Sequence, residues 1–412
     1  MRRSVLWLAA IASLAIAAKK ATDDTSNPAY KDTPVSVAPN TTGKPAPPVG
    51  FLHPGILVNR GQLNEIKRRV EKGIEPQKSA FEALEASKWG ARDYMPHPRA
   101  TVECGSQSNP DYGCKDEQAD SEAAYGQALL WYITGDKVYA ENAMRILNGW
   151  ATTLTGGHTN ANGQVQASWT GDVFPRAAEI MRFSYKGWTD ADTLRLQNMF
   201  TTQFLPMLIH GTCENGNKEL TQSEAIINIG VFNDNRTVFE WGLKMWRGRT
   251  PAYIYLESDG PKPIEPPGCG MAIWGNKGFM PKLVNGILQE TARDSQHPAL
   301  ALAGMVDAAE TARLQGVDLY GEQETRITAA LEFVAQNLPP NNAKPPENLE
   351  FQLHPTWEIA FNQYHNRMGI PLPKMAAVIK GNRPTGVNHE MAWETLTHGE
   401  MGEVGVPPLK AR

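Results

Sequence analysis

Helical patterns that follow one another along the chain, separated by Gly, Pro and Asp turns, most constrain its fold. Apolar residues recur at helical spacing over 61–73, 121–134 and 138–150, and the break at Gly135 and Asp136 makes the last two segments a helical hairpin. The same pattern predicts further helices over 172–184, 189–206, 220–233, 237–247, 298–314, 323–337 and 356–367. Few segments alternate like a strand, and 252–256 is the one short example.

Many helical hairpins in one chain predict an all-α fold, either an open solenoid or a closed α/α toroid. The sequence has no strict period of a standard solenoid repeat, so we expect a toroid, an incomplete α/α barrel built of helical hairpins. A toroid carries its catalytic groups at one rim, on loops and helix starts, where polar turns such as 210–219 and 289–297 fall. We assign this domain to 51–380, and 381–412 to a tail packed on its surface, with Trp393 as an anchor.

The N-terminus has the pattern of a secretory signal peptide over 1–18. A basic start is followed by an apolar run from 5 to 16 and by small residues at the cleavage region. This run is too short to span a bilayer comfortably. Residues 19–50 are rich in Pro, Thr, Ser and Asn, which predicts a disordered or extended leader. We therefore expect a secreted, extracellular protein that has no membrane contact after cleavage.

Secretion makes the four cysteines candidates for disulfide bonds. Cys104 and Cys114 flank a short loop and are the easiest pair, which leaves Cys213 with Cys269, although four cysteines allow three pairings. Asn40 and Asn235 lie in glycosylation sequons. There is no CxxC and no convincing zinc spacing, so we expect neither a metal nor a cofactor.

Composition narrows the classes of partner. The 412 residues are 41% hydrophobic and 20% charged, which is ordinary for a globular protein, and we see no second domain of useful size. A net charge of -4 provides no global field for nucleic acid or an acidic membrane. Eleven Trp residues offer flat apolar faces that can stack on sugar rings. We expect a monomer.

The segment 289–297 concentrates the most chemistry. It holds an acid, a base, a cation and amides within nine residues, and Pro298 then opens an Ala/Leu-rich helical run. Because a residue before proline avoids helical angles, we expect His297 to be the last non-helical residue, with Asp294 or Ser295 helping to cap the helix. The alternative is a polar helix start with a solvated histidine.

Four other segments carry candidate site residues, and each has a structural alternative. The turn 215–220 places Asn217 at a helix start, although Asn and Gly also favour turns for local reasons. The segment 164–169 is expected to be a polar loop before a helix. Arg and Tyr residues in 246–255 and in 354–367 could bind carboxylates and stack on sugar rings. Favourable interaction with a helix dipole explains the first segment equally well, and a snorkelling helix end explains the second.

Taken in order, these motifs resemble the alginate lyase-like polysaccharide lyases, most closely polysaccharide lyase family 38, whose members act on alginate or glucuronan. The resemblance runs from about 53 to about 373. It rests on Asn215-Gly216-Asn217-x-Glu219-Leu220, Trp246-Arg247-Gly248-Arg249-x-Pro251-Ala252-Tyr253, Gln289-Glu290-Thr291-x-Arg293-Asp294-x-x-His297, Gln315-Gly316-Val317-Asp318-Leu319-Tyr320-Gly321 and the run from Glu358 to Arg367. It implies an α/α toroid and metal-independent β-elimination on a 4-linked polyuronate, either glucuronan or an alginate such as polymannuronate. Lys218 stands where an aromatic residue often follows the Asn.

Such an elimination needs a neutralised C5 carboxylate, a base for the neighbouring proton and an acid for the departing O4. His297 suits the base, and Tyr364 suits the acid, although the two roles can be exchanged. Donors that stabilise the enolate are Asn217, Gln289, Arg293 and a protonated Glu290. The remaining predicted substrate-binding residues are Arg367, Tyr253, Trp169, His365 and Gln166.

Two other functions are compatible with the sequence. A glycoside hydrolase on the same toroid needs two facing carboxylic acids, which Glu219, Glu290, Asp294 and Glu358 leave open. A non-catalytic glycan-binding protein is compatible with the Trp content. A new C4=C5 double bond, which absorbs ultraviolet light, separates a lyase from both.

Overall fold

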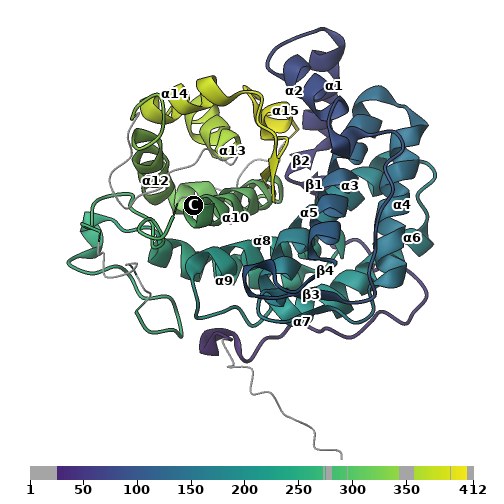
Figure 1. The fold of residues 1–412 in the computed structure, drawn as a ribbon, viewed down its shortest axis with the longest axis horizontal. Coiled ribbons are helices and arrows are strands. Elements are labelled where there is room, and N and C mark those ends of the chain that lie inside the picture. The colour runs from purple at the N-terminus through teal and green to yellow at the C-terminus, as the bar shows by residue number, and fades with distance from the viewer. Residues whose placement is uncertain are drawn as a thin grey trace, which may run out of the picture.

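The structure is a computed structural model that describes residues 26–271, 274, 281–294, 296–342, 357–389 and 391–405. Helices dominate these residues and are arranged as a ring (Figure 1). The predicted signal peptide over 1–18 lies outside the described part of the chain. In the described part, no helix is long and apolar enough to cross a membrane.

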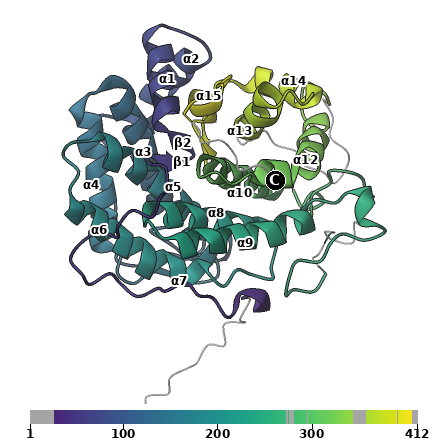
Figure 2. The ribbon, with the colours of Figure 1, turned by 180° about the vertical axis from the view of Figure 1, so that it is seen from behind.

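The ring closes between the two ends of the domain. Going round it, each helix packs on the next in the order α1 (Arg60–Glu71), α3 (Cys114–Thr134), α5 (Gly163–Ser184), α8 (Gly216–Phe232), α10 (Gln296–Leu314), α13 (Glu358–Phe361) and α15 (Glu394–His398). Helix α15 in turn contacts α1 and α2 (Gln77–Glu85), and both views show these helices together (Figures 1 and 2). The predicted all-α toroid is confirmed.

Other helices pair with this ring as hairpin partners. Helix α4 (Lys137–Thr153) packs on α3, and α9 (Arg236–Tyr253) packs on α8. The remaining helices are α6 (Asp190–Met199), α7 (Leu205–Leu208), α11 (Leu319–Glu322), α12 (Glu324–Gln336) and α14 (Pro373–Asn382). Two π-helical turns, Phe200–Phe204 and Asn362–Arg367, continue α6 and α13.

Two long helices of the ring are buried almost throughout. Almost every described residue of α8 and of α10 is buried, so these two helices form the centre of the core. They cross closely at Gly304, where an added Cβ would lie 2.8 Å from the backbone nitrogen of Thr221. A larger residue at Gly304 would therefore push the two helices apart.

The strands are short, and the first pair is buried among α5, α8 and α10 of the ring. Strand β1 (Gly55–Ile56) pairs with β2 (Val58–Asn59), and β6 (Val387–Asn388) pairs with β7 (Met391–Ala392), both antiparallel. Strand β3 (Val102–Cys104) lies between antiparallel β4 (Asp111–Tyr112) and parallel β5 (His158–Thr159).

Two local expectations were wrong. The expected polar loop 164–169 belongs to the first turns of α5. The expected strand 252–256 is reduced to one bridge between Ile254 and Leu288, because α9 continues to Tyr253.

Both ends of the domain are more firmly packed than predicted. In the expected disordered leader, residues 26–50 lie against the ring, with Tyr30 buried and the Asn27 side chain donating to Glu219 at 3.1 Å. The tail packs on the domain with Trp393 as an anchor, as expected, and Met391 and Leu396 are buried with it where the ring closes. Buried apolar side chains and hydrogen bonds thus offset the conformational entropy that these segments lose when they become ordered.

Both expected disulfide bonds are present. Cys104 is joined to Cys114, and Cys213 is joined to Cys269. Use of the sequons at Asn40 and Asn235 stays a prediction, and the Asn235 side chain caps α9 by accepting from the Val238 amide.

Candidate active site

An open pocket of about 880 Å³ lies where four helices of the ring begin. The first turns of α3, α5, α8 and α10 contribute Lys115, Gln166, Asn217 and His297 to its lining. The loop closed by the Cys104–Cys114 disulfide forms another part of the wall. The pocket therefore occupies the end of the toroid at which helix starts were expected to carry the chemistry.

This pocket is electrostatically suited to an anion. Each helix start directs the positive end of its helix dipole toward this end of the ring, although Asp294, Gln289 and Glu290 already accept from the first backbone N–H groups of α10 and α8. Lys115, Lys218 and Arg293 add cationic side chains, whereas Glu214 is the only acidic side chain in the lining formed by described residues. Lys218 forms an ion pair with Glu214, so that acid is neutralised. Lys115 and Arg293 are paired as well, with Asp111 and Glu290, but their side chains remain 78% and 40% exposed and can still meet an anionic ligand.

Asp294 and His297 form a hydrogen-bonded pair at the start of α10. The Asp294 carboxylate accepts from the His297 backbone N–H at 2.9 Å and from Nδ1 of its ring at 2.6 Å and 2.8 Å. Burial alone would raise the pKa of Asp294, but the hydrogen bonds from His297 outweigh burial and lower it. With Nδ1 bound to the carboxylate, Nε2 is the nitrogen left to accept a proton.

This cap was expected from the sequence, although we expected His297 to lie just before the helix. The helix in fact begins two residues before Pro298, at Gln296, so His297 is in its first turn. The His297 side chain is 25% exposed and lines the pocket.

Glu290 lies beneath the pocket floor and organises three donors. Its carboxylate accepts from Asn217 Nδ2 at 2.6 Å, from the Tyr253 hydroxyl at 2.9 Å and from Arg293 Nη1 at 2.9 Å. We expected a protonated Glu290 that donates to substrate, but these partners all donate to it. Glu290 therefore acts as an acceptor that positions Asn217 and Arg293, both of which line the pocket.

Tyr253 and Gln289 support this floor from inside the protein. Tyr253 is completely buried, and burial together with the neighbouring Glu290 raises the pKa of its hydroxyl well above the usual value. Gln289 accepts from the Gly216 backbone N–H at 3.1 Å and so fixes the start of α8. Neither residue contributes to the pocket lining, so direct substrate contact, as the sequence suggested, is not supported.

Gln166 and Trp169 line the pocket from α5, as expected for substrate-binding residues. Gln166 Nε2 donates to the Cys114 carbonyl at 3.0 Å and to Glu117 at 2.8 Å, which ties α5 to α3. The Trp169 ring makes an edge-to-face contact with His389, at a centroid distance of 4.5 Å.

Three predicted site residues lie elsewhere. Tyr364 is fully buried and its hydroxyl donates to the Tyr320 carbonyl at 3.0 Å, so the structure does not support its expected role as acid. His365 is exposed on the surface, where Nδ1 donates to the Ile370 carbonyl.

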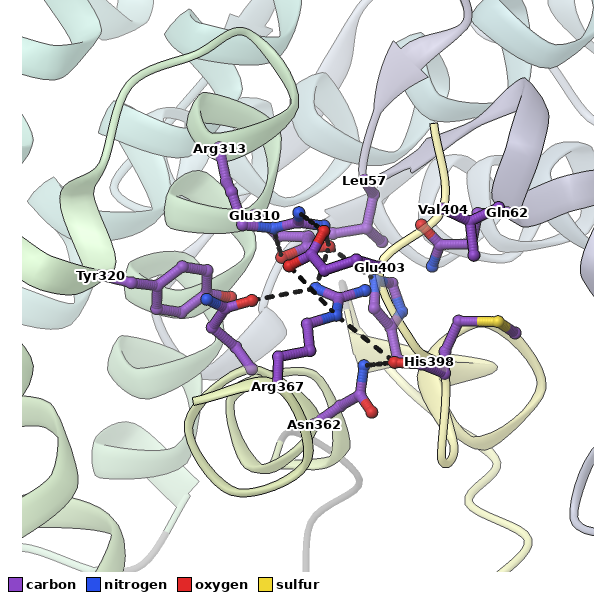
Figure 3. A network of polar contacts seen from close by, with 12 residues as sticks. Leu57, Gln62, Glu310, Arg313, Tyr320, Asn362, Arg367, His398, Glu403 and Val404 are labelled. Carbon is purple, nitrogen blue, oxygen red and sulfur yellow. Dashed lines mark hydrogen bonds and ion pairs between the residues drawn. The ribbon is translucent and has the colours of Figure 1, made fainter. Parts of the chain in front are cut away.

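Arg367 is also remote from the pocket lining. Its guanidinium group pairs with buried Glu310 at 3.3 Å, inside a network near the C-terminal segment (Figure 3). An arginine whose charge is neutralised inside the protein is not placed to hold a uronate carboxylate, so this assignment is corrected.

Arg247 and Arg249 are likewise occupied. Arg247 pairs with Glu322 at 2.7 Å, and buried Arg249 pairs with Glu219 at 3.1 Å. Their motif therefore reflects the packing of α9.

Lys115 and His389 are among the lining residues that were not predicted from the sequence. Lys115 follows Cys114 at a helix start, and the disulfide prediction could have indicated its position. His389 lies more than 90 residues after His297 in the sequence, in a segment assigned to the tail. No local pattern links it to the other site residues.

The residues that the structure describes contain no group of three or more His, Cys, Asp or Glu side chains arranged to hold a metal ion.

A family model described as alginate lyase matches residues 66–344, more than half of the chain. No curated protein sequence matches the chain significantly.

Solved structures share the fold at low sequence identity. A variant of alginate lyase A1-III complexed with a tetrasaccharide is 16% identical, with a TM-score of 0.58 over 82% of this chain and 93% of that one. Alginate lyase A1-III from Sphingomonas species A1 is 17% identical, with a TM-score of 0.57 over 82% and 94%. An alginate lyase from Bacteroides ovatus is 16% identical, with a TM-score of 0.56 over 84% and 99%. With the family match, this common fold shows that the chain belongs to the alginate lyase family and is a polysaccharide lyase.

Proposed function

We propose that this enzyme cleaves a 4-linked polyuronate by β-elimination in the pocket at the helix starts, leaving a C4=C5 unsaturated uronate end. One observation carries the proposal: the pocket joins four helix N-termini to an Asp294–His297 pair and to Arg293. One pocket can therefore bind an anionic sugar, and it supplies both a base and a group that stabilises negative charge. Secretion, a monomeric state and membership of family 38 remain predictions that accompany this proposal.

His297 is the base in this mechanism. Its Nε2 removes the C5 proton of the uronate, while Asp294 holds the ring orientation and stabilises the imidazolium that forms. The electron pair of the C5–H bond passes into the enolate and then forms the C4=C5 bond as the C4–O4 bond breaks.

Asn217 and Arg293 stabilise the enolate. Glu290 holds both side chains by hydrogen bonds, so they are oriented before substrate binds. Preorganised donors of this kind act on charge that develops in the transition state, where they lower the barrier most. Since these tasks are all assigned to side chains, we propose that the reaction is metal-independent, so a chelator should leave the rate unchanged.

The departing O4 must also receive a proton. With Tyr364 buried away from the pocket, we assign this task to the His297 imidazolium, which returns the proton that it removed. A single group can serve both roles only when the C5 proton and O4 lie on the same face of the ring. This holds for β-D-mannuronate and β-D-glucuronate and fails for α-L-guluronate. We therefore propose polymannuronate or glucuronan as the substrate.

The lining argues against the hydrolase alternative. Hydrolysis needs two carboxyl groups across the scissile bond. Of the acids considered from sequence, Glu219 is paired with Arg249 and Glu358 with Arg383, while Glu290 and Asp294 hold site residues.

The decisive assay is ultraviolet absorbance with polymannuronate, polyguluronate, glucuronan and a neutral glucan. Absorbance should rise on polymannuronate or glucuronan. New reducing ends without absorbance would indicate a hydrolase, and binding without either product would indicate a glycan-binding protein.

A further inference from the structure

The C-terminal hairpin brings a second histidine into the pocket. His389 lies between β6 and β7, lines the pocket and packs against Trp169 at 4.5 Å in an edge-to-face contact. Its Nδ1 lies 2.8 Å from the Asn388 side-chain oxygen, which orients the ring. The mechanism above uses neither His389 nor Trp169.

The position of His389 is built into the fold. Its backbone has φ of 56°, a left-handed conformation that suits the tight turn between the two strands. Met391, just beyond the turn, is buried with Leu300 and Ala303 of α10, and Trp169 packs on the same cluster. The apolar contact thus joins the hairpin, the catalytic helix α10 and the pocket wall.

The chain beyond the hairpin is held equally firmly. Trp393 is buried, and the segment around His398 and Glu403 enters the ionic network with Glu310, Arg313 and Arg367 (Figure 3). The C-terminal segment is therefore anchored on both sides of α15, and His389 is presented by a fixed support.

We propose that Trp169 and His389 together form a sugar-binding subsite of the pocket, in which Trp169 offers an aromatic surface to a pyranose ring and His389 hydrogen-bonds a uronate hydroxyl or carboxylate. This proposal rests on the proposed function, since it takes a uronate as the ligand. Aromatic surfaces contribute large contact area to sugar rings, and a ring nitrogen adds a directional polar contact. His389 is a binding residue here, so it stabilises the ground state and the transition state equally.

The test is His389→Asn. Asparagine tolerates the left-handed turn, so the hairpin keeps its backbone while the aromatic ring is lost. We expect KM to rise about tenfold, the size of one lost ring contact and hydrogen bond, with kcat unchanged. His365→Asn is the matched control, because that histidine also packs on an aromatic ring but is exposed outside the pocket; its KM should equal that of the wild type.

Other outcomes would overturn the subsite. A fall in kcat at unchanged KM would make His389 a proton donor, and unchanged kinetics would remove it from the site. Calorimetric titration of a mannuronate or glucuronate oligomer, in a His297→Ala background, separates the two proposals. A Kd weakened about tenfold by His389→Asn supports the subsite even if no elimination is detected. An unchanged Kd rejects it even if the enzyme is an active lyase.

Discussion

Two regions of the molecule contain a histidine beside a carboxylate and arginine, yet they differ in what these groups can do. In the pocket, His297 is paired with Asp294 and is 25% exposed. In the C-terminal network, His398 and Glu310 are fully buried, with Arg313 at 2.6 Å from Glu310 and Arg367 at 3.3 Å (Figure 3). The same residue types form a reactive site in the pocket, whereas Glu310, Arg313, Arg367 and His398 form a buried ionic network that holds the C-terminal segment, called the clamp below.

Charge compensation explains the difference. Although burial opposes it, Arg313 and Arg367 hold the pKa of Glu310 well below its usual value. Burial lowers the pKa of His398, against the attraction of Glu310. The clamp is thus neutralised internally. In the pocket, Lys115 and Arg293 are also paired with acids, but their side chains are 78% and 40% exposed, so they stay available to an anionic ligand.

The largest expected effect comes from removing the reactive histidine. His297→Ala should lower kcat roughly a thousandfold, as expected for loss of a general base, while the melting temperature changes little. Initial rates of unsaturated-end formation, together with thermal denaturation, measure both. A variant that keeps more than about a tenth of the wild-type rate would remove His297 from the mechanism.

Arg367→Ala tests whether Arg367 stabilises the fold or binds substrate. It leaves Glu310 with fewer partners inside the protein, so unfolding should become easier by about 3–5 kcal/mol, while KM is unchanged. Urea denaturation gives the free energy of unfolding, and kinetics below the transition give KM. A higher KM with unchanged stability would restore the substrate-binding role suggested by the sequence.

A pH effect on stability should arise from buried acids of the core. Burial raises the pKa of Asp307 to about 7, an effect that Arg176 opposes. Burial likewise raises the pKa of Glu122 and of Glu219 to about 7. The folded state then binds more protons than the unfolded state between the unfolded and folded pKa values, so stability falls as pH rises through this range.

Urea denaturation from about pH 4.5 to about pH 8 should therefore show a decreasing free energy of unfolding, by a few kcal/mol. Asp307→Asn should flatten the slope, since its side chain is neutral at every pH. A stability that rises with pH across this window would show that these carboxyl groups are ionised in the fold.

Asp294→Asn tests whether Asp294 orients the His297 ring for catalysis. Asparagine still caps α10, so stability should be retained, but it no longer selects the productive ring tautomer of His297. We expect kcat to fall by about a hundredfold, less than in His297→Ala. Full activity in this variant would mean that the Asp294 contact serves only the helix.

The smallest effect is expected at the rim. Lys115 is exposed and paired with Asp111 at 3.0 Å, so Lys115→Ala should raise KM by only about twofold to threefold at low ionic strength. Added salt should remove this difference, because it screens an exposed charge. A KM effect that persists at high salt would indicate a direct contact with substrate.

The sequence was most informative where chemistry and local structure coincide. Local rules predicted the Asp294 cap and a helix start near Pro298, and the structure places His297 of this helix start in the pocket lining. Periodicity likewise predicted the helices and, with the lack of strand patterns, the toroid.

Long-range packing accounts for the errors. Tyr364 and Arg367 have the residue types of a polyuronate site, and only the course of the π-helical turn shows that they point into the core. His389 could not be predicted because its place depends on the ring closing between α15 and the first helices. The packing of segment 26–50 was not predicted, because composition gives only the average tendency to disorder and does not show that a single residue such as Tyr30 will be buried.

The central claim is that a uronate binds at the convergent helix starts. The most direct test is a crystal structure of His297→Ala with a mannuronate or glucuronate oligomer. We predict that a uronate carboxylate lies beside Asn217 and Arg293, with its C5 facing the position of the missing imidazole. An oligomer bound outside this pocket, or with C5 turned away from residue 297, would contradict it.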